Sequence, residues 1–77
     1  MKTTQVNGLW WFAITSEMAL NFNTGLVNRG GSPFTQFRKV FPECPRGKRE
    51  ALLWVNELAK ANNLRLSNSF MKTIEKL

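Results

Sequence analysis

Residues 34–58, FTQFRKVFPECPRGKREALLWVNEL, contain the strongest local signals of the chain. The first part, residues 34–41, mixes aromatic and β-branched side chains with polar ones, as a half-buried strand does. The middle part, residues 42–49, holds two prolines, one glycine and three positive charges and therefore predicts a turn. The apolar residues that follow recur at helical spacing and would form one broad face, made of Ala51, Leu52, Trp54, Val55, Leu58 and Ala59. We expect this helix to bury that face, with Trp54 in the core.

Residues 8–15, GLWWFAIT, are rich in aromatic and β-branched side chains and predict a first strand. The alternation of a strand would turn three large side chains toward the core, namely Trp10, Phe12 and Ile14. Trp11 and Thr15 would then lie on the outer face. Trp11 would be covered there by another segment or subunit, or it would contact a ligand.

The segment between the two predicted strands is less clearly patterned. Residues 16–22 fit either a helix or a second strand, and we favour a strand. Residues 28–33, NRGGSP, are typical of a loop. An arginine beside two glycines could also let backbone amides approach a phosphate there.

The C-terminal part predicts a second, short helix. Asn62 and Asn63 are suited to end the main helix in a left-handed conformation, and Ser67 and Asn68 are candidates to cap the next one. The last helix would carry an apolar stripe made of Phe70, Ile74 and Leu77. We expect this stripe to pack on the same domain.

These segments together predict an α+β fold, in which a small antiparallel sheet of about three strands packs against one main C-terminal α-helix, with a short terminal helix. A chain of 77 residues supports one small domain with a modest core. We expect residues 1–7 to form a flexible N-terminal arm and residues 8–77 to form a single domain.

The charge of the chain favours a polyanionic partner. Its net charge is +6, with a pI near 10.3. Six of the eleven lysines and arginines fall within 21 positions that contain one acid, Glu43, and these are Arg29, Arg38, Lys39, Arg46, Lys48 and Arg49. The clustering favours nucleic acid over a membrane.

The residue types that are missing argue against an enzyme. The chain has no His, Asp or Tyr, so it cannot build a Ser-His-Asp or Cys-His arrangement or a His-containing metal site. Its five glutamates are scattered, and Cys44 is alone, so no internal disulfide can form. We expect no catalytic residue, metal or cofactor. The longest apolar run, residues 9–14, is far too short to span a membrane, and a reducing, cytoplasmic compartment fits the lone cysteine.

Three segments of the chain resemble the N-terminal arm-site DNA-binding domains of phage and conjugative-transposon tyrosine integrases. The resemblance rests on the GLWWFAI stretch, on KVFP at residues 39–42, and on PRGKREA leading into a helix that contains Trp54. It implies a three-stranded sheet packed on one helix, with the outer sheet face entering the major groove of DNA. It also implies that the chain is a freestanding relative encoded by a phage or prophage.

The leading hypothesis is therefore a non-enzymatic protein that binds double-stranded DNA. Carried over from the resemblance, Trp11 and Thr15 would face the DNA, and Gln36 and Arg38 would read base edges. Contacts to phosphates would come from Arg29, Lys39, Arg46, Lys48 and Arg49. The alternative is a small phage-type protein that binds and inhibits a host protein through Trp11 and the apolar tail. RNA ranks below DNA because no ribonucleoprotein signature is present, and the oligomeric state stays open.

Overall fold

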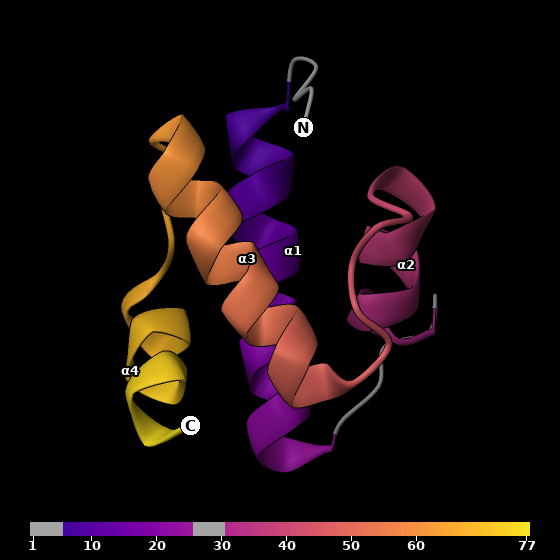
Figure 1. Ribbon diagram of the computed structural model, residues 1–77. Helices are drawn as coiled ribbons and strands as arrows, with labels where there is room; N and C mark the ends of the chain where they lie inside the picture. Colours follow the sequence, from indigo (N-terminus) through magenta and orange to yellow (C-terminus); the bar gives the residue numbers. More distant parts are fainter. Residues whose placement is uncertain (1–5, 26–30) are drawn as a thin grey trace.

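The computed structural model describes residues 6–25 and 31–77, and these form four α-helices (Figure 1). The helices are α1 (Gly8–Thr24), α2 (Pro33–Val40), α3 (Lys48–Asn62) and α4 (Asn68–Lys76). No sheet occurs within these residues, and only Gly31 is in a single bridge. The predicted α+β fold with an antiparallel sheet is therefore wrong, and the protein is a small helical domain.

The predicted first strand is the first half of α1. Asn7 begins this helix, because its side-chain oxygen accepts hydrogen bonds from the backbone N–H groups of Leu9 and Trp10, at 2.9 and 3.2 Å. Gly25 ends it with a φ of 76°, a left-handed conformation that glycine adopts without strain. The buried residues are spaced at three and four positions, and they are Trp11, Ile14, Thr15, Met18, Ala19 and Asn21. Helical periodicity therefore overrides the β-propensity of the aromatic residues.

The predicted strand at residues 34–41 is also helical. Ser32 accepts a hydrogen bond from the backbone N–H of Phe34 at 3.2 Å, and Pro33 occupies the first helical turn, where its missing N–H costs nothing. Phe34, Phe37 and Phe41 follow one another at helical spacing, and all three are buried. A cap and a proline therefore start α2 where composition alone suggested a strand.

The two predicted C-terminal helices are confirmed. In α3 the buried face consists of Ala51, Leu52, Val55, Leu58 and Ala59, while Trp54 is only partly buried at its edge. Asn63 ends this helix with a φ of 55°, the left-handed stop expected there. Ser67 caps α4 by accepting a hydrogen bond from the N–H of Phe70 at 3.2 Å, and the Phe70 side chain is fully buried.

Helix α1 is the centre of the fold and packs against all three other helices (Figure 1). Helix α3 crosses it on one side, and α2 and α4 lie on opposite flanks. The contact with α4 includes a side-chain hydrogen bond of 2.8 Å from Asn23 Nδ2 to Thr73 Oγ1. Val6, just before α1, also packs against the core.

Five aromatic rings join α1, α2 and α3 in one cluster. Phe37 lies at its centre, with ring centroids 4.9 Å from Phe41, 5.7 Å from Trp11, 6.1 Å from Trp54 and 6.2 Å from Trp10. These separations suit offset-stacked and edge-to-face pairs. The cluster holds the short helix α2 against the longer helices.

The absence of a sheet in the described residues also overturns the resemblance to integrase arm-site domains, which is defined by a three-stranded sheet packed on a helix. The stretches that suggested it lie in α1, in α2 with the loop after it, and at the start of α3. No β face is present in these segments to enter a DNA groove.

Among residues 6–25 and 31–77, none of the helices combines the length and the apolar character needed to cross a membrane.

Candidate nucleic-acid interface

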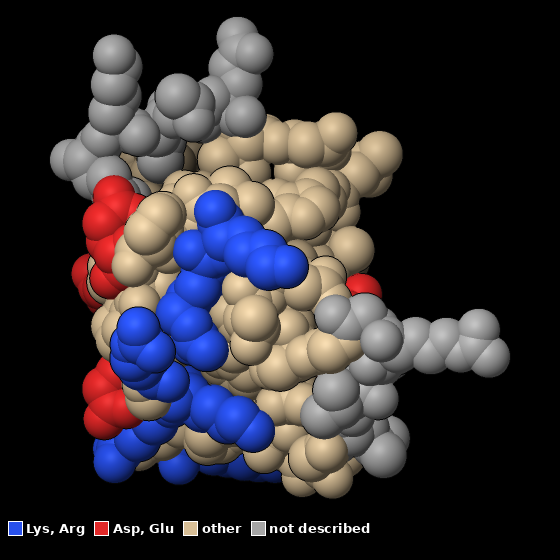
Figure 2. Space-filling view, turned by 90° about the vertical axis from the view of Figure 1, so that its right-hand side faces the viewer, with Lys and Arg blue, Asp and Glu red and all other residues tan. Residues whose placement is uncertain are grey.

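Positively charged side chains gather on the side of the molecule that carries α2 and the loop after it. Figure 2 shows this side, where lysines and arginines form a band and acidic groups lie at the edges of the view. We call the positive residues of α2, of the loop and of the first turn of α3 the basic face, and they are Arg38, Lys39, Arg46, Lys48 and Arg49. The structure therefore brings together most of the charges that cluster in the sequence.

Within the basic face, Lys39 and Arg46 are exposed. Lys39 lies in the last turn of α2, where a positive charge is favoured by the helix dipole, and Arg46 lies just before the start of α3. These two side chains are placed to contact a large anion at the surface.

Arg38 is partly buried and contacts the protein itself. Its Nη1 lies 3.5 Å from the main-chain oxygen of Pro45, at the long limit of a hydrogen bond. This contact connects α2 to the loop that follows it. Arg38 is therefore better placed to support the loop than to read a base.

The two cations at the start of α3 also have partners. The Lys48 Nζ lies 5.7 Å from the centroid of the Phe34 ring, within the range of a cation–π contact. The Arg49 Nη2 donates a hydrogen bond of 3.1 Å to the main-chain oxygen of Leu77, which links α3 to the end of α4. Both side chains are exposed and keep their charge at the surface.

An acid lies beside these cations. Gly47 is the N-cap residue of α3, and the carboxylate of Glu50 occupies the place that a Cβ at position 47 would take. A glutamate at this third helical position can reach back toward the start of its helix, where the dipole favours a negative charge. The Glu50 carboxylate therefore competes with any other anion that approaches the start of α3.

Two residues expected to face DNA lie in the core instead. The Trp11 and Thr15 side chains are fully buried, and the Thr15 hydroxyl donates to the main-chain oxygens of Trp11 and Phe12, at 2.8 and 3.3 Å. Both point inward from α1, so the outer-face placement derived from a strand is wrong. Gln36 is partly buried on α2, and Arg29 lies outside the described residues.

Cys44 is buried in the loop between α2 and α3. Burial raises the pKa of its thiol from 9.0 to about 11, and the nearby positive charge of Arg38 only partly opposes this. Cys44 therefore stays protonated at neutral pH, which makes it a poor nucleophile and metal ligand. Within the described ranges, no three His, Cys, Asp or Glu side chains come together to hold a metal.

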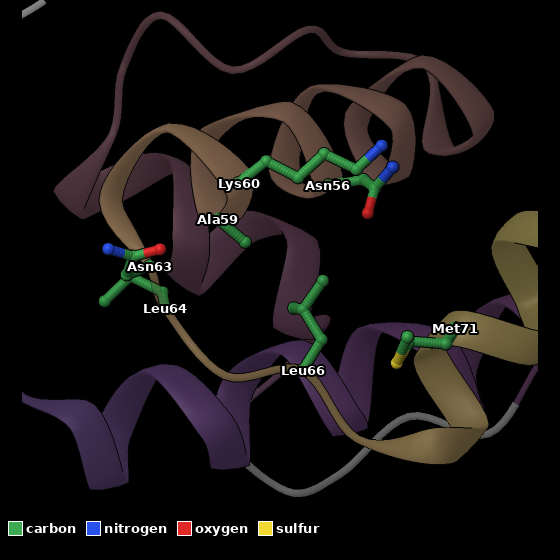
Figure 3. Close-up of a pocket in the computed structure, with 7 residues that line it drawn as sticks. All are labelled: Asn56, Ala59, Lys60, Asn63, Leu64, Leu66 and Met71. Carbon is green, nitrogen blue, oxygen red and sulfur yellow. The ribbon is translucent and has the colours of Figure 1, made fainter.

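A second surface, not predicted from the sequence, is a groove formed by two adjacent hollows. One hollow, of about 620 Å³, is lined by the start of α1 and by residues 63–65. The other, of about 330 Å³, lies between the last turns of α3, the linker after it and Met71 of α4 (Figure 3). Asn63 and Leu64 line both hollows, so the two are neighbours at the end of α3.

We call this surface the apolar groove. Its large apolar side chains are Leu9, Phe12, Leu64, Leu66 and Met71, and its charged side chains are Lys60 and Arg65. A signal existed in the sequence, because the Asn63 stop turns the chain sharply and places Leu64 and Leu66 beside α3. The side chains that α1 contributes to the groove, Leu9 and Phe12, could not be foreseen while residues 8–15 were interpreted as a strand.

Comparison of the chain with protein-family models, with curated proteins and with solved structures finds no match. The basic face and the apolar groove are therefore the features from which a function can be inferred.

Proposed function

We propose that this protein is non-enzymatic and binds double-stranded DNA through the basic face, by contacts to the phosphate backbone. The observation that carries the proposal is the band of lysine and arginine side chains on the side of α2 (Figure 2), together with the exposure of Lys39, Arg46 and Lys48 in α2, the loop after it and the first turn of α3. Such contacts supply most of the sequence-independent affinity of DNA-binding proteins. They fix position on the duplex but carry no sequence information directly.

The chemistry of the basic face supports phosphate contact better than base recognition. Its cations extend from a short helix, a loop and the first turn of another helix, and Arg38 is committed to the Pro45 carbonyl. Phosphates along a duplex accept contacts from such a dispersed set, whereas base reading needs side chains held on an element that enters a groove. We therefore expect little dependence on DNA sequence.

The proposal includes a cytoplasmic location. It is supported by the buried, unpaired thiol of Cys44, which suits a reducing compartment.

The test is fluorescence anisotropy of a labelled random duplex over a series of salt concentrations. Each phosphate contact contributes about 0.9 to the slope of log K against log salt. The triple variant Lys39→Gln, Arg46→Gln, Lys48→Gln should therefore show a slope shallower by about 2.7. Circular dichroism should show that the variant remains helical.

A matched control removes the same number of charges elsewhere. Lys60→Gln, Arg65→Gln and Lys72→Gln lie on α3, the linker and α4, and all three positions are exposed. This control should keep the wild-type slope. Equal losses in the two triple variants would show that net charge alone attracts DNA, and wild-type protein that binds no duplex at low salt would refute the proposal.

Glu50→Gln provides a test with the opposite sign. Its carboxylate lies at the start of α3, beside Lys48 and Arg49, and repels a phosphate that approaches there. Removing this charge should strengthen DNA binding about two- to fivefold at low salt, because a repulsion between surface charges contributes a few tenths of a kcal/mol or more. Weaker binding by Glu50→Gln would exclude this end of α3 from the interface.

A further inference from the structure

We propose that the apolar groove binds an acidic amphipathic helix of a partner protein. This surface is separate from the basic face, because it lies at the last turns of α3, whereas the basic face lies on α2, the loop after it and the first turn of α3 (Figure 1). The inference therefore adds a protein partner to the proposed DNA contact and does not depend on it.

Three of the six exposed large apolar side chains of the described residues line the groove. Leu9 is 85% exposed, Met71 53% and Phe12 42%, although all three are large hydrophobic residues. They come from α1 and α4, and the linker residues Leu64 and Leu66 connect them. A contiguous apolar surface rimmed by polar groups is a common mark of an interaction site.

The shape of the groove favours a helix as its occupant. Its walls are the ends of α1 and α3, the linker and α4, and the described part of the chain offers no sheet edge to which an extended peptide could add a strand. The two hollows lie in succession around the end of α3. Successive apolar side chains on one face of a helix, at i, i+3 or i+4 and i+7, can enter such hollows.

The charge at the rim determines the chemistry of that helix. Lys60 and Arg65 line the groove, and none of the described residues that line it is acidic. Figure 3 shows the Lys60 side chain extended along α3 beside Asn56, above the apolar floor made by Ala59 and Leu66. A partner helix with carboxylates flanking its apolar face would match these cations.

The same charges disfavour a second copy of this chain. In a two-fold symmetric pair, each groove would face its own equivalent and bring Lys60 and Arg65 toward their counterparts. The whole chain is also strongly basic, at +6. Like charges at an interface oppose association, so an acidic partner suits the groove better.

The test uses a labelled, end-capped peptide of about 16 residues, which corresponds to roughly four helical turns. It carries leucine at i, i+3, i+4 and i+7, glutamate beside this face and alanine elsewhere. Titration into ¹⁵N-labelled protein should shift the amide signals of Leu9, Phe12, Leu64 and Met71. A peptide of the same composition with the leucines spread around the helix should bind at least about tenfold more weakly.

Variants of the protein test the two components of the groove. Lys60→Glu with Arg65→Glu should weaken binding of the acidic peptide at least about tenfold and should instead favour a peptide with lysine in place of glutamate. Met71→Ser should weaken the acidic peptide by about tenfold and leave duplex DNA binding unchanged. The matched control is Leu53→Ser, because Leu53 is also exposed but lines neither hollow, and it should bind the peptide like wild type.

Three results would overturn the inference. One is that the peptide does not bind at about 1 mM, a concentration at which even a binding free energy of about 4 kcal/mol is detected. Another is that the peptide shifts only the amide signals of the basic face, which would show unspecific charge attraction. The third is concentration-dependent self-association of the protein in sedimentation, weakened by Met71→Ser, which would make the groove an interface between copies.

Discussion

Replacing Phe37 by alanine should remove about a quarter of the stability of the protein or more. The Phe37 side chain is fully buried, and its ring lies within 6.2 Å of four other aromatic rings, measured between centroids. Truncation of a buried phenylalanine costs about 3 to 5 kcal/mol. A domain of 77 residues has a total stability of about 4 to 12 kcal/mol, at about 0.05 to 0.15 kcal/mol per residue.

The loss should be measured by urea denaturation, followed by circular dichroism and by tryptophan emission. Tryptophan emission is informative because Trp10, Trp11 and Trp54 all have ring contacts with Phe37. The matched control is Phe12→Ala, which deletes the same side chain from a position that is 42% exposed and should cost about 1 kcal/mol or less. If Phe37→Ala costs no more than Phe12→Ala, the aromatic cluster does not hold α2 to the domain.

Three further changes test the local structure. Ser67→Ala removes the cap of α4 and should cost about 1 kcal/mol in urea denaturation, whereas the exposed Ser69→Ala should cost clearly less. Asn63→Val forces a β-branched residue into a left-handed conformation and should lower stability by about 1 to 2 kcal/mol, while Asn63→Gly should be close to neutral in the same assay. The pKa of Cys44 is raised from 9.0 to about 11 in the folded protein, which means that the folded state binds the thiol proton more tightly. The stabilisation that comes from this proton is complete below pH 9 and is lost as the pH rises toward 11. Between about pH 8 and 10.5, the melting temperature of the wild type should therefore fall relative to that of Cys44→Ser. A difference in melting temperature that stays constant over this range would contradict the raised pKa.

The C-terminal half of the fold could be predicted because its signals are local and agree with one another. In α3 a continuous apolar face is followed by Asn63, which adopts the left-handed stop. In α4 the cap at Ser67 precedes Phe70 by the spacing that a helix start requires. Periodicity and capping both indicate a helix there, and no strong β-propensity opposes them.

The N-terminal half was predicted wrongly because composition was given more weight than capping. The sequence GLWWFAIT has the side chains of a strand, yet Asn7 starts a helix and Trp11, Ile14 and Met18 lie on one helical face. Likewise, Ser32 and Pro33 are a helix-start signal at the entrance of α2. Bulky aromatic residues fit a helix when a cluster of other rings receives them, and that cluster is formed by residues distant in sequence.

The functional residues were predictable to the extent that they are charges close together in the chain. The cations between positions 38 and 49 stay close together whether this segment forms a strand and turn or a helix and loop. The side chains assigned by alternation were not predictable, because Trp11 and Thr15 change from outside to inside when the period changes from two to about 3.6. The linker side of the apolar groove could be indicated by the Asn63 stop, but its α1 side depends on contacts between distant parts of the chain that no local pattern shows.

The packing of α1 against α4 has a consequence for synthesis of the protein on the ribosome. Asn23 and Thr73, which join these helices, are separated by 50 positions. Phe70 of α4 is fully buried, so the core is incomplete until α4 has emerged. During translation, which proceeds at about 5 to 20 residues per second, α1 therefore waits for several seconds with part of its apolar surface uncovered. A nascent chain stalled before α4 should bind general chaperones that the completed chain does not.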